Sequence, residues 1–79
     1  MPEALVNLRL DHDLKLRDVV RKVAAVDNVK WARLIFGPTD AVAFIQTRHW
    51  IELETTVYKI SSVEGVLETD TRILVPETE

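Results

Sequence analysis

Hydrophobic positions alternate with polar ones in two stretches, one near each end of the chain. Over Glu3–Leu10 the even positions are apolar and most odd positions are polar, which is the two-residue period of a β-strand with one buried face. The stretch Val66–Val75 alternates in the same way, and Pro76 ends it. We therefore predict one strand near each end of the chain.

Two other stretches carry apolar residues at helical spacing, with charged or polar residues between them. Asp11–Asp13 offers N-cap candidates for the first helix, which ends near Asn28, a residue that tolerates the left-handed conformation. Thr47 is the N-cap candidate for the second helix, and Gly65 suits its C-terminal end. The two apolar stripes are Leu16, Val19, Val20, Val23 and Ala24, and Trp50, Leu53, Val57 and Ile60.

Between the helices we predict two strands, over Val29–Phe36 and Ala41–Thr47, joined by a turn at Gly37–Asp40. The first is rich in β-branched and aromatic residues, and neither of its faces is cleanly polar. The second is apolar at every position over Ala41–Ile45, so neither of its faces suits contact with water. One short chain can cover one of these faces with its own helices, but the other face then needs a second chain.

The order of elements is strand, helix, strand, strand, helix, strand, which is the ferredoxin-like βαββαβ arrangement of the α+β class. Right-handed crossovers place both helices on one face of a four-stranded antiparallel sheet. The other face carries Trp31, Ile35 and alternate residues of Ala41–Ile45, and the sequence does not decide which alternates these are. Because a large apolar patch does not normally stay in water, we predict a homodimer with two sheets packed face to face.

Length, charge and cysteine content limit the classes of function. The 79 residues allow one domain, over residues 1–79, and domains of this size often gain stability from oligomerisation. With no cysteine and only two histidines, His12 and His49, we predict no disulfide and no metal site, and nothing points to a cofactor. A net charge of -3 argues against direct contact with nucleic acid. Because no signal peptide or membrane-spanning run is present, we expect a soluble cytoplasmic protein.

Two short motifs, in register with all six elements, resemble a known family. They are the Gly37-x-x-Asp40 turn before an apolar strand and the ending Gly65-Val66-x-x-Thr69-x-Thr71. Together they resemble the effector-binding domain of the Lrp/AsnC transcription regulators, also called the domain for regulation of amino-acid metabolism. The resemblance covers nearly the whole chain. It implies a dimeric α/β barrel, further assembly into a ring of dimers, and an amino acid or related small molecule bound between dimers.

The resemblance also implies which residues bind the ligand and which partners the chain has. Most regulators of this family carry an N-terminal helix-turn-helix domain, whereas this chain starts at its first strand and so resembles the stand-alone version without a DNA-binding domain. Full-length Lrp/AsnC-type regulators are then implied partners, as subunits with which a ligand sensor can co-assemble. The implied ligand-binding residues are Gly37, Pro38, Thr39, Asp40, Thr69 and Thr71.

The residue types at these positions suit a free α-amino acid. Asp40 offers an acceptor for the ammonium group, and backbone N–H groups near Gly37 can approach a carboxylate closely. The hydroxyl groups of Thr39, Thr69 and Thr71 can donate or accept hydrogen bonds. The same residues also have a purely structural explanation, since Asp and Thr favour turns and alternating Thr favours strands.

Three alternatives belong to other classes. Dimeric α/β barrels include small monooxygenases, but the predicted strands contain no His or Tyr, so we predict no catalytic residues and no enzyme. Regulatory domains of the ACT type share the element order, but they carry their binding glycine in the loop after the first strand, where this chain has Asp11–Asp13. An assembly subunit without any ligand is the third alternative, and the sequence leaves it open.

Overall fold

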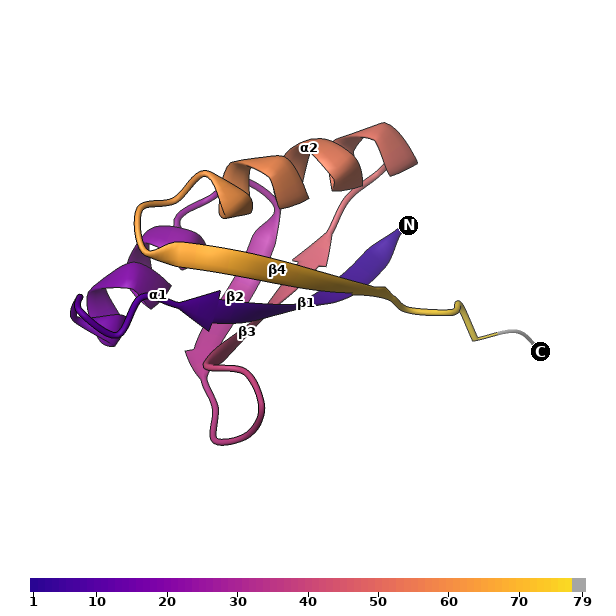
Figure 1. Cartoon of the computed structure of the whole chain (residues 1–79). Helices are drawn as coiled ribbons and strands as arrows, with labels where there is room; N and C mark the ends of the chain where they lie inside the picture. The colour runs from indigo at the N-terminus through magenta and orange to yellow at the C-terminus, as the bar shows by residue number, and fades with distance from the viewer. Residues whose placement is uncertain (78–79) are drawn as a thin grey trace.

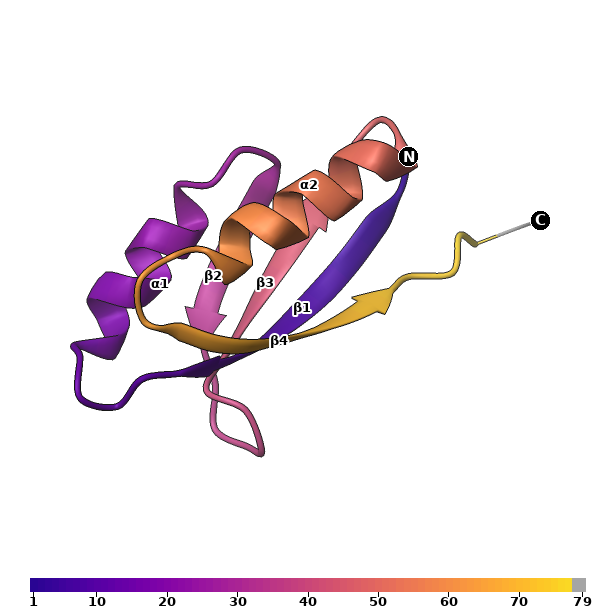
Figure 2. The ribbon, with the colours of Figure 1, turned by 45° about the horizontal axis from the view of Figure 1, so that its top comes forward.

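The computed structural model describes residues 1–77 and contains four strands and two helices. The strands form one antiparallel sheet in the order β2-β3-β1-β4, and Figures 1 and 2 show both helices on the same face of it. The predicted ferredoxin-like α+β fold is therefore confirmed. The elements are β1 (Glu3–Leu10), α1 (Leu16–Ala24), β2 (Val29–Leu34), β3 (Ala41–Gln46), α2 (Trp50–Ser61) and β4 (Val66–Ile73).

The hydrophobic core lies between the sheet and the two helices. The even residues of β1 and the odd residues of β3 point into it, and Val6 lies opposite Ala43 in the register of the two strands. Full burial of a Val or Leu side chain stabilises the fold by about 1.5–3 kcal/mol, so these central strands provide much of the stability. The core residues are Ala4, Val6, Leu8, Leu10, Val19, Val20, Val23, Ala41, Ala43, Ile45, Leu53 and Ile60.

The register also decides which residues of β3 face away from the helices. Val42 and Phe44 lie on that side, and Phe44 stacks on Trp31 with 5.8 Å between the ring centroids. Trp31 remains 42% exposed. We call Leu5, Trp31, Val42 and Phe44 the open face. The polar pairs around it are Arg9–Glu68, Gln46–Glu3 and Arg72–Asp70.

The helices begin later than the predicted caps, so both cap predictions are wrong. The N-cap of α1 is Lys15, while Asp11 accepts a hydrogen bond from the Asp13 N–H at 2.9 Å and shapes the preceding turn. The N-cap of α2 is His49, whose N–H donates to the Glu52 carboxylate at 3.0 Å. Thr47 instead donates its hydroxyl to the His49 carbonyl at 3.0 Å.

Both outer strands end earlier than predicted, since β2 was expected to reach Phe36 and β4 to reach Val75. β2 stops at Leu34 because the chain leaves the sheet after the Ile35 N–H bonds the Asp40 carbonyl at 3.0 Å. β4 stops at Ile73 because its partner strand begins at Glu3, to whose carbonyl the Leu74 N–H donates at 2.9 Å.

Two residues of the predicted apolar stripes, Ala24 and Trp50, are exposed, so these two predictions are wrong. Thr56 belongs to the buried stripe of α2 instead, where its hydroxyl donates to the Glu52 carbonyl at 2.8 Å. In β4, Leu67 is 60% exposed, and a bulge between Arg9 and Leu10 shifts the pairing at this point.

Residues with positive φ fix the two loops that follow the helices. Asn28 has φ 73°, as predicted, and its side-chain amide donates to the Thr56 hydroxyl at 3.3 Å. Gly65 has φ 99°, and a Cβ there would lie 2.6 Å from Cγ2 of Val19. Its carbonyl accepts the Asp11 N–H at 2.8 Å, so this glycine holds the start of β4 against β1 and α1. Within residues 1–77, neither helix is long and apolar enough to cross a membrane.

Candidate functional site

The loop between β2 and β3, residues 35–40, is held at its base and free at its tip. The Asp40 N–H donates to the Leu8 carbonyl at 2.9 Å, which fixes the loop to the neighbouring strand β1. At the exposed tip, no atom lies within 4 Å of the position that a Gly37 Cβ would occupy. A small molecule can therefore approach the Gly37 backbone, while Pro38 beside it is also exposed.

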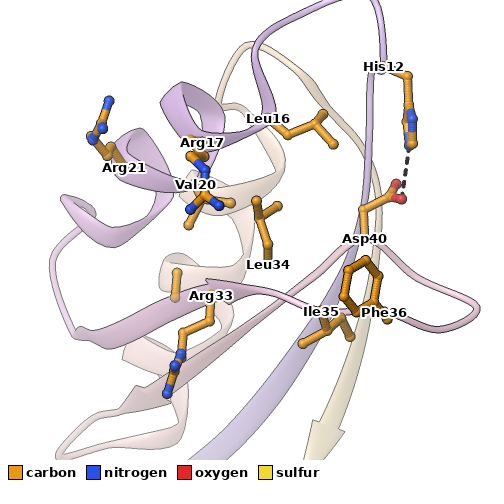
Figure 3. A pocket seen from close by; sticks show the side chains of 11 residues that line it. His12, Leu16, Arg17, Val20, Arg21, Arg33, Leu34, Ile35, Phe36 and Asp40 are labelled. Atoms are coloured by element: carbon orange, nitrogen blue, oxygen red, sulfur yellow. Dashed lines mark hydrogen bonds and ion pairs between the residues drawn. The ribbon is translucent and has the colours of Figure 1, made fainter.

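Asp40 joins this loop to the loop that follows β1. Its Oδ2 accepts the Leu10 N–H at 2.8 Å, and its Oδ1 lies 2.9 Å from Nε2 of His12 (Figure 3). The hydrogen bond from the Leu10 N–H, followed by the one from His12, lowers the pKa of the Asp40 carboxyl below its ordinary value. Asp40 is therefore held ionised, with both carboxylate oxygens already in contact with protein groups.

Thr39 points to a different side of the loop. Its hydroxyl lies 3.5 Å from Oδ1 of Asn7, and both residues line a hollow of about 230 Å³ that also reaches Thr69. Ionic side chains surround this hollow, among them the pair Arg9–Glu68. The structure thus brings two of the predicted binding residues, Thr39 and Thr69, to one place.

Thr71 lies with Thr69 on the helix side of β4. Both residues line a hollow of about 420 Å³ between α2 and β4, together with Val57 and Tyr58. Asp40 does not line this hollow. The six residues predicted from the family resemblance are therefore distributed over four places on one molecule, which are the loop tip, the surroundings of Asp40 and the two hollows that Thr69 borders.

A hollow of about 740 Å³, larger than the two described above, lies between α1 and β2 and ends at Asp40; we call it the α1–β2 groove (Figure 3). The groove is not recognisable from the sequence, because the charged residues of α1 have the spacing of a solvated helix face. Only the position of β2 at the sheet edge, next to α1, turns part of that face into a wall. The residues that line the groove include Leu16, Arg17, Val20, Ala32, Leu34 and Asp40.

A family model, the Lrp/AsnC ligand binding domain, matches residues 3–78. The chain belongs to this family. The match confirms the resemblance drawn from the two short motifs, and it supports a regulatory, effector-binding domain. No curated protein sequence matches the chain significantly.

Solved structures with similar folds include two that match this chain over nearly the whole length of both chains. TTHA0845 from Thermus thermophilus is 26% identical, with 100% of this chain and 99% of that chain covered and a TM-score of 0.88. Hypothetical protein PHS023 from Pyrococcus horikoshii is 26% identical, with 98% and 93% covered and a TM-score of 0.85.

A more distant structural match is the transcriptional regulator NMB0573 from Neisseria meningitidis, solved as a complex with L-Met. It is 15% identical, and its TM-score is 0.83. The match covers 99% of this chain but only 52% of that regulator. At this identity the likeness shows a shared fold.

Proposed function

We propose that this Lrp/AsnC domain is an amino-acid-binding and oligomerisation module of transcriptional or metabolic regulation. The family match over residues 3–78 carries the proposal. The L-Met complex of the Neisseria meningitidis regulator, which has the same fold, supports an amino acid as the class of ligand. The module acts through assembly, with itself and with full-length Lrp/AsnC-type regulators, and performs no chemical step.

The open face supports the assembly part of the proposal. Its apolar centre, Leu5, Trp31, Val42 and Phe44, sits inside a border of paired polar side chains, an arrangement typical of protein interfaces. A second copy that packs its own open face there covers both patches at once and closes two sheets into a barrel. Trp31 is suited to be an anchor because large aromatic residues contribute much of the binding energy at interfaces.

The distribution of the binding residues supports a ligand site between molecules. The loop Gly37–Asp40 lies at one end of the sheet, whereas Thr71 lies in the hollow beside α2. Asp40 and Thr71 line different hollows of one molecule, but one small ligand can contact both where β4 of one molecule meets the loop of another. A ring of dimers with an amino acid between dimers fulfils this condition.

At such a site, the loop provides groups for both charges of an amino acid. The ligand carboxylate accepts hydrogen bonds from backbone N–H groups near Gly37, where no side chain blocks the approach. The ligand ammonium lies against Asp40, which Leu10 and His12 keep ionised. Hydroxyl groups of Thr39, Thr69 and Thr71 supply the remaining contacts.

A thermal-shift screen of the twenty amino acids, with mass measured by light scattering in parallel, tests this function. At least one amino acid should raise Tm, because a ligand that binds only the folded state stabilises it by mass action. Asp40→Ala should abolish that shift, while Asp27→Ala, which changes an exposed carboxylate elsewhere, should leave it intact. A monodisperse monomer at micromolar concentration would contradict the dimer. A stable oligomer that responds to no amino acid would favour a ligand-free assembly subunit.

A further inference from the structure

The α1–β2 groove has an apolar interior large enough for a small organic molecule. Its volume of about 740 Å³ falls within the usual range of ligand pockets. Val20 from α1 and Leu34 from β2 lie on facing walls, and Ile35 and Phe36 lie at one end (Figure 3). Phe36 packs against nothing in the single molecule and is fully exposed, so its ring is available to a ligand in the groove.

The charges that line the groove are unequal in number. Arg17, Arg21 and Arg33 line it, against a single carboxylate, Asp40. Arg21 already pairs with Asp18 at 2.8 Å, and Figure 3 shows Arg33 extending away from α1. Arg17 lies beside Val20 on the α1 wall, and no carboxylate of residues 1–77 forms an ion pair with it. The groove therefore offers one cation without a partner at the edge of an apolar surface.

The single carboxylate of the groove, Asp40, lies at its end, whereas Arg17 lies on the α1 wall (Figure 3). An ammonium group on a ligand that binds Arg17 within the groove would therefore lose contact with water without gaining a carboxylate partner. A ligand carboxylate, in contrast, meets the guanidinium of Arg17, which can donate two parallel hydrogen bonds to it.

From this geometry we propose that the α1–β2 groove is a second binding site, for carboxylates with an apolar body and no ammonium group, such as 2-oxo acids. Arg17 binds the carboxylate, and Val20, Ala32 and Leu34 contact the apolar body. The site is complete within one molecule, so it depends neither on the amino-acid site between molecules nor on the dimer. A single domain would then distinguish an amino acid from the corresponding 2-oxo acid by binding them at different places.

NMR titrations that follow the amide signals of the ¹⁵N-labelled protein test this site with four probes. The 2-oxo acid of leucine should shift the amide signals of Val20, Ala32 and Leu34. L-leucine, which has the same body but adds an ammonium, should bind this groove at least about tenfold more weakly. Acetate, which has the charge without the body, and the neutral alcohol of the same carbon skeleton should each also bind at least about tenfold more weakly. Equal shifts with L-leucine or with acetate would overturn the proposed selectivity.

Substitution of Arg17 locates the anion contact. Arg17→Gln should weaken 2-oxo acid binding by about tenfold or more, because a hydrogen bond to a charged group is lost, and Arg17→Lys should keep part of the affinity. Arg48→Gln, which removes an exposed arginine outside the groove, is the matched control and should bind like the wild type. Unchanged binding by Arg17→Gln, or an absence of shifts with the 2-oxo acid, would reject the site. An amino-acid response in the thermal-shift screen alongside either result would leave the function proposed above intact.

Discussion

The two glycines of this chain occupy opposite environments, although both stand at the entrance to a strand. Gly65 has φ 99° and is packed so closely that a Cβ would lie 2.6 Å from Val19 Cγ2. Gly37 also has a positive φ, 158°, but beyond its chain neighbours nothing lies within 4 Å of its Cβ position. Packing and conformation therefore both require a glycine at residue 65, whereas at residue 37 only the backbone conformation favours one and packing makes no demand. The difference indicates that Gly65 serves the fold and leaves Gly37 available for a ligand.

The largest expected effect comes from Gly65→Ala. The methyl group meets Val19 and Leu14, and the backbone conformation is unfavourable for any residue with a Cβ. We expect a loss of about 2–4 kcal/mol in the free energy of unfolding, from strain and overpacking together. Tm at fixed protein concentration should fall by roughly 10 °C or more, since one kcal/mol corresponds to several degrees in so small a domain.

A double-mutant cycle separates the two causes of that loss. In a Val19→Ala background the nearest contact of the new methyl group is gone, although the φ of residue 65 is unchanged. Gly65→Ala should therefore cost less there than in the wild type, by about 1 kcal/mol or more. Additive losses would show that backbone strain, and not the contact with Val19, makes this glycine necessary.

The loops that contain the two glycines also differ in their acidic residues, Asp40 and Glu64. The contributions of these two residues to stability should depend differently on pH. The Leu10 N–H, and then His12, lower the pKa of Asp40 in the folded state below its value in the unfolded chain. Its contribution to stability is therefore fully present above about pH 5 and is lost as pH falls through the ordinary aspartate range toward the lowered folded pKa. The acidic residue beside Gly65 is Glu64, an exposed residue whose Oε1 lies 3.8 Å from Nζ of Lys22.

Asp40→Asn should consequently destabilise the protein at neutral pH, and its difference from the wild type should shrink as the solution is acidified. Glu64→Gln is the matched control, and its difference from the wild type should stay small at every pH because an exposed ion pair contributes little. Urea unfolding at a series of pH values measures both differences. A constant difference for Asp40→Asn would mean that the two hydrogen bonds do not favour the ionised carboxylate.

The sequence predicted the fold well because its signals are local. Alternation over Glu3–Leu10 and the helical stripe from Leu16 to Val23 each reflect one element that buries one face. Asn28 was also predictable, since few residues other than glycine adopt its backbone conformation. Which side of β3 faces the helices was not predictable, because both sides are apolar. Only the pairing of Val6 with Ala43 in the sheet determines it.

The candidate sites were less predictable because they depend on contacts between distant residues. The Asp40 carboxylate accepts a hydrogen bond from the N–H of Leu10, thirty positions earlier. No local sequence pattern predicts that this backbone donor lies next to Asp40. Arg17 has the spacing of a solvated residue and becomes part of a groove only because β2 forms the sheet edge beside α1. Family resemblance indicated the loop Gly37–Asp40, but it did not indicate the groove next to it.

Gly37→Ala is the counterpart of Gly65→Ala, and its expected effect on stability is smaller. The positive φ of residue 37 disfavours a residue with a Cβ, but its surroundings are empty, so the free energy of unfolding should fall by about 1–2 kcal/mol, from backbone strain without overpacking. A methyl group at this position should also hinder the approach of a ligand carboxylate to the loop backbone. The amino-acid-induced rise in Tm, measured from the Tm of each free protein, should therefore decrease. A loss of stability as large as that of Gly65→Ala would show that packing also requires Gly37, and an undiminished ligand response would remove the loop backbone from the proposed site.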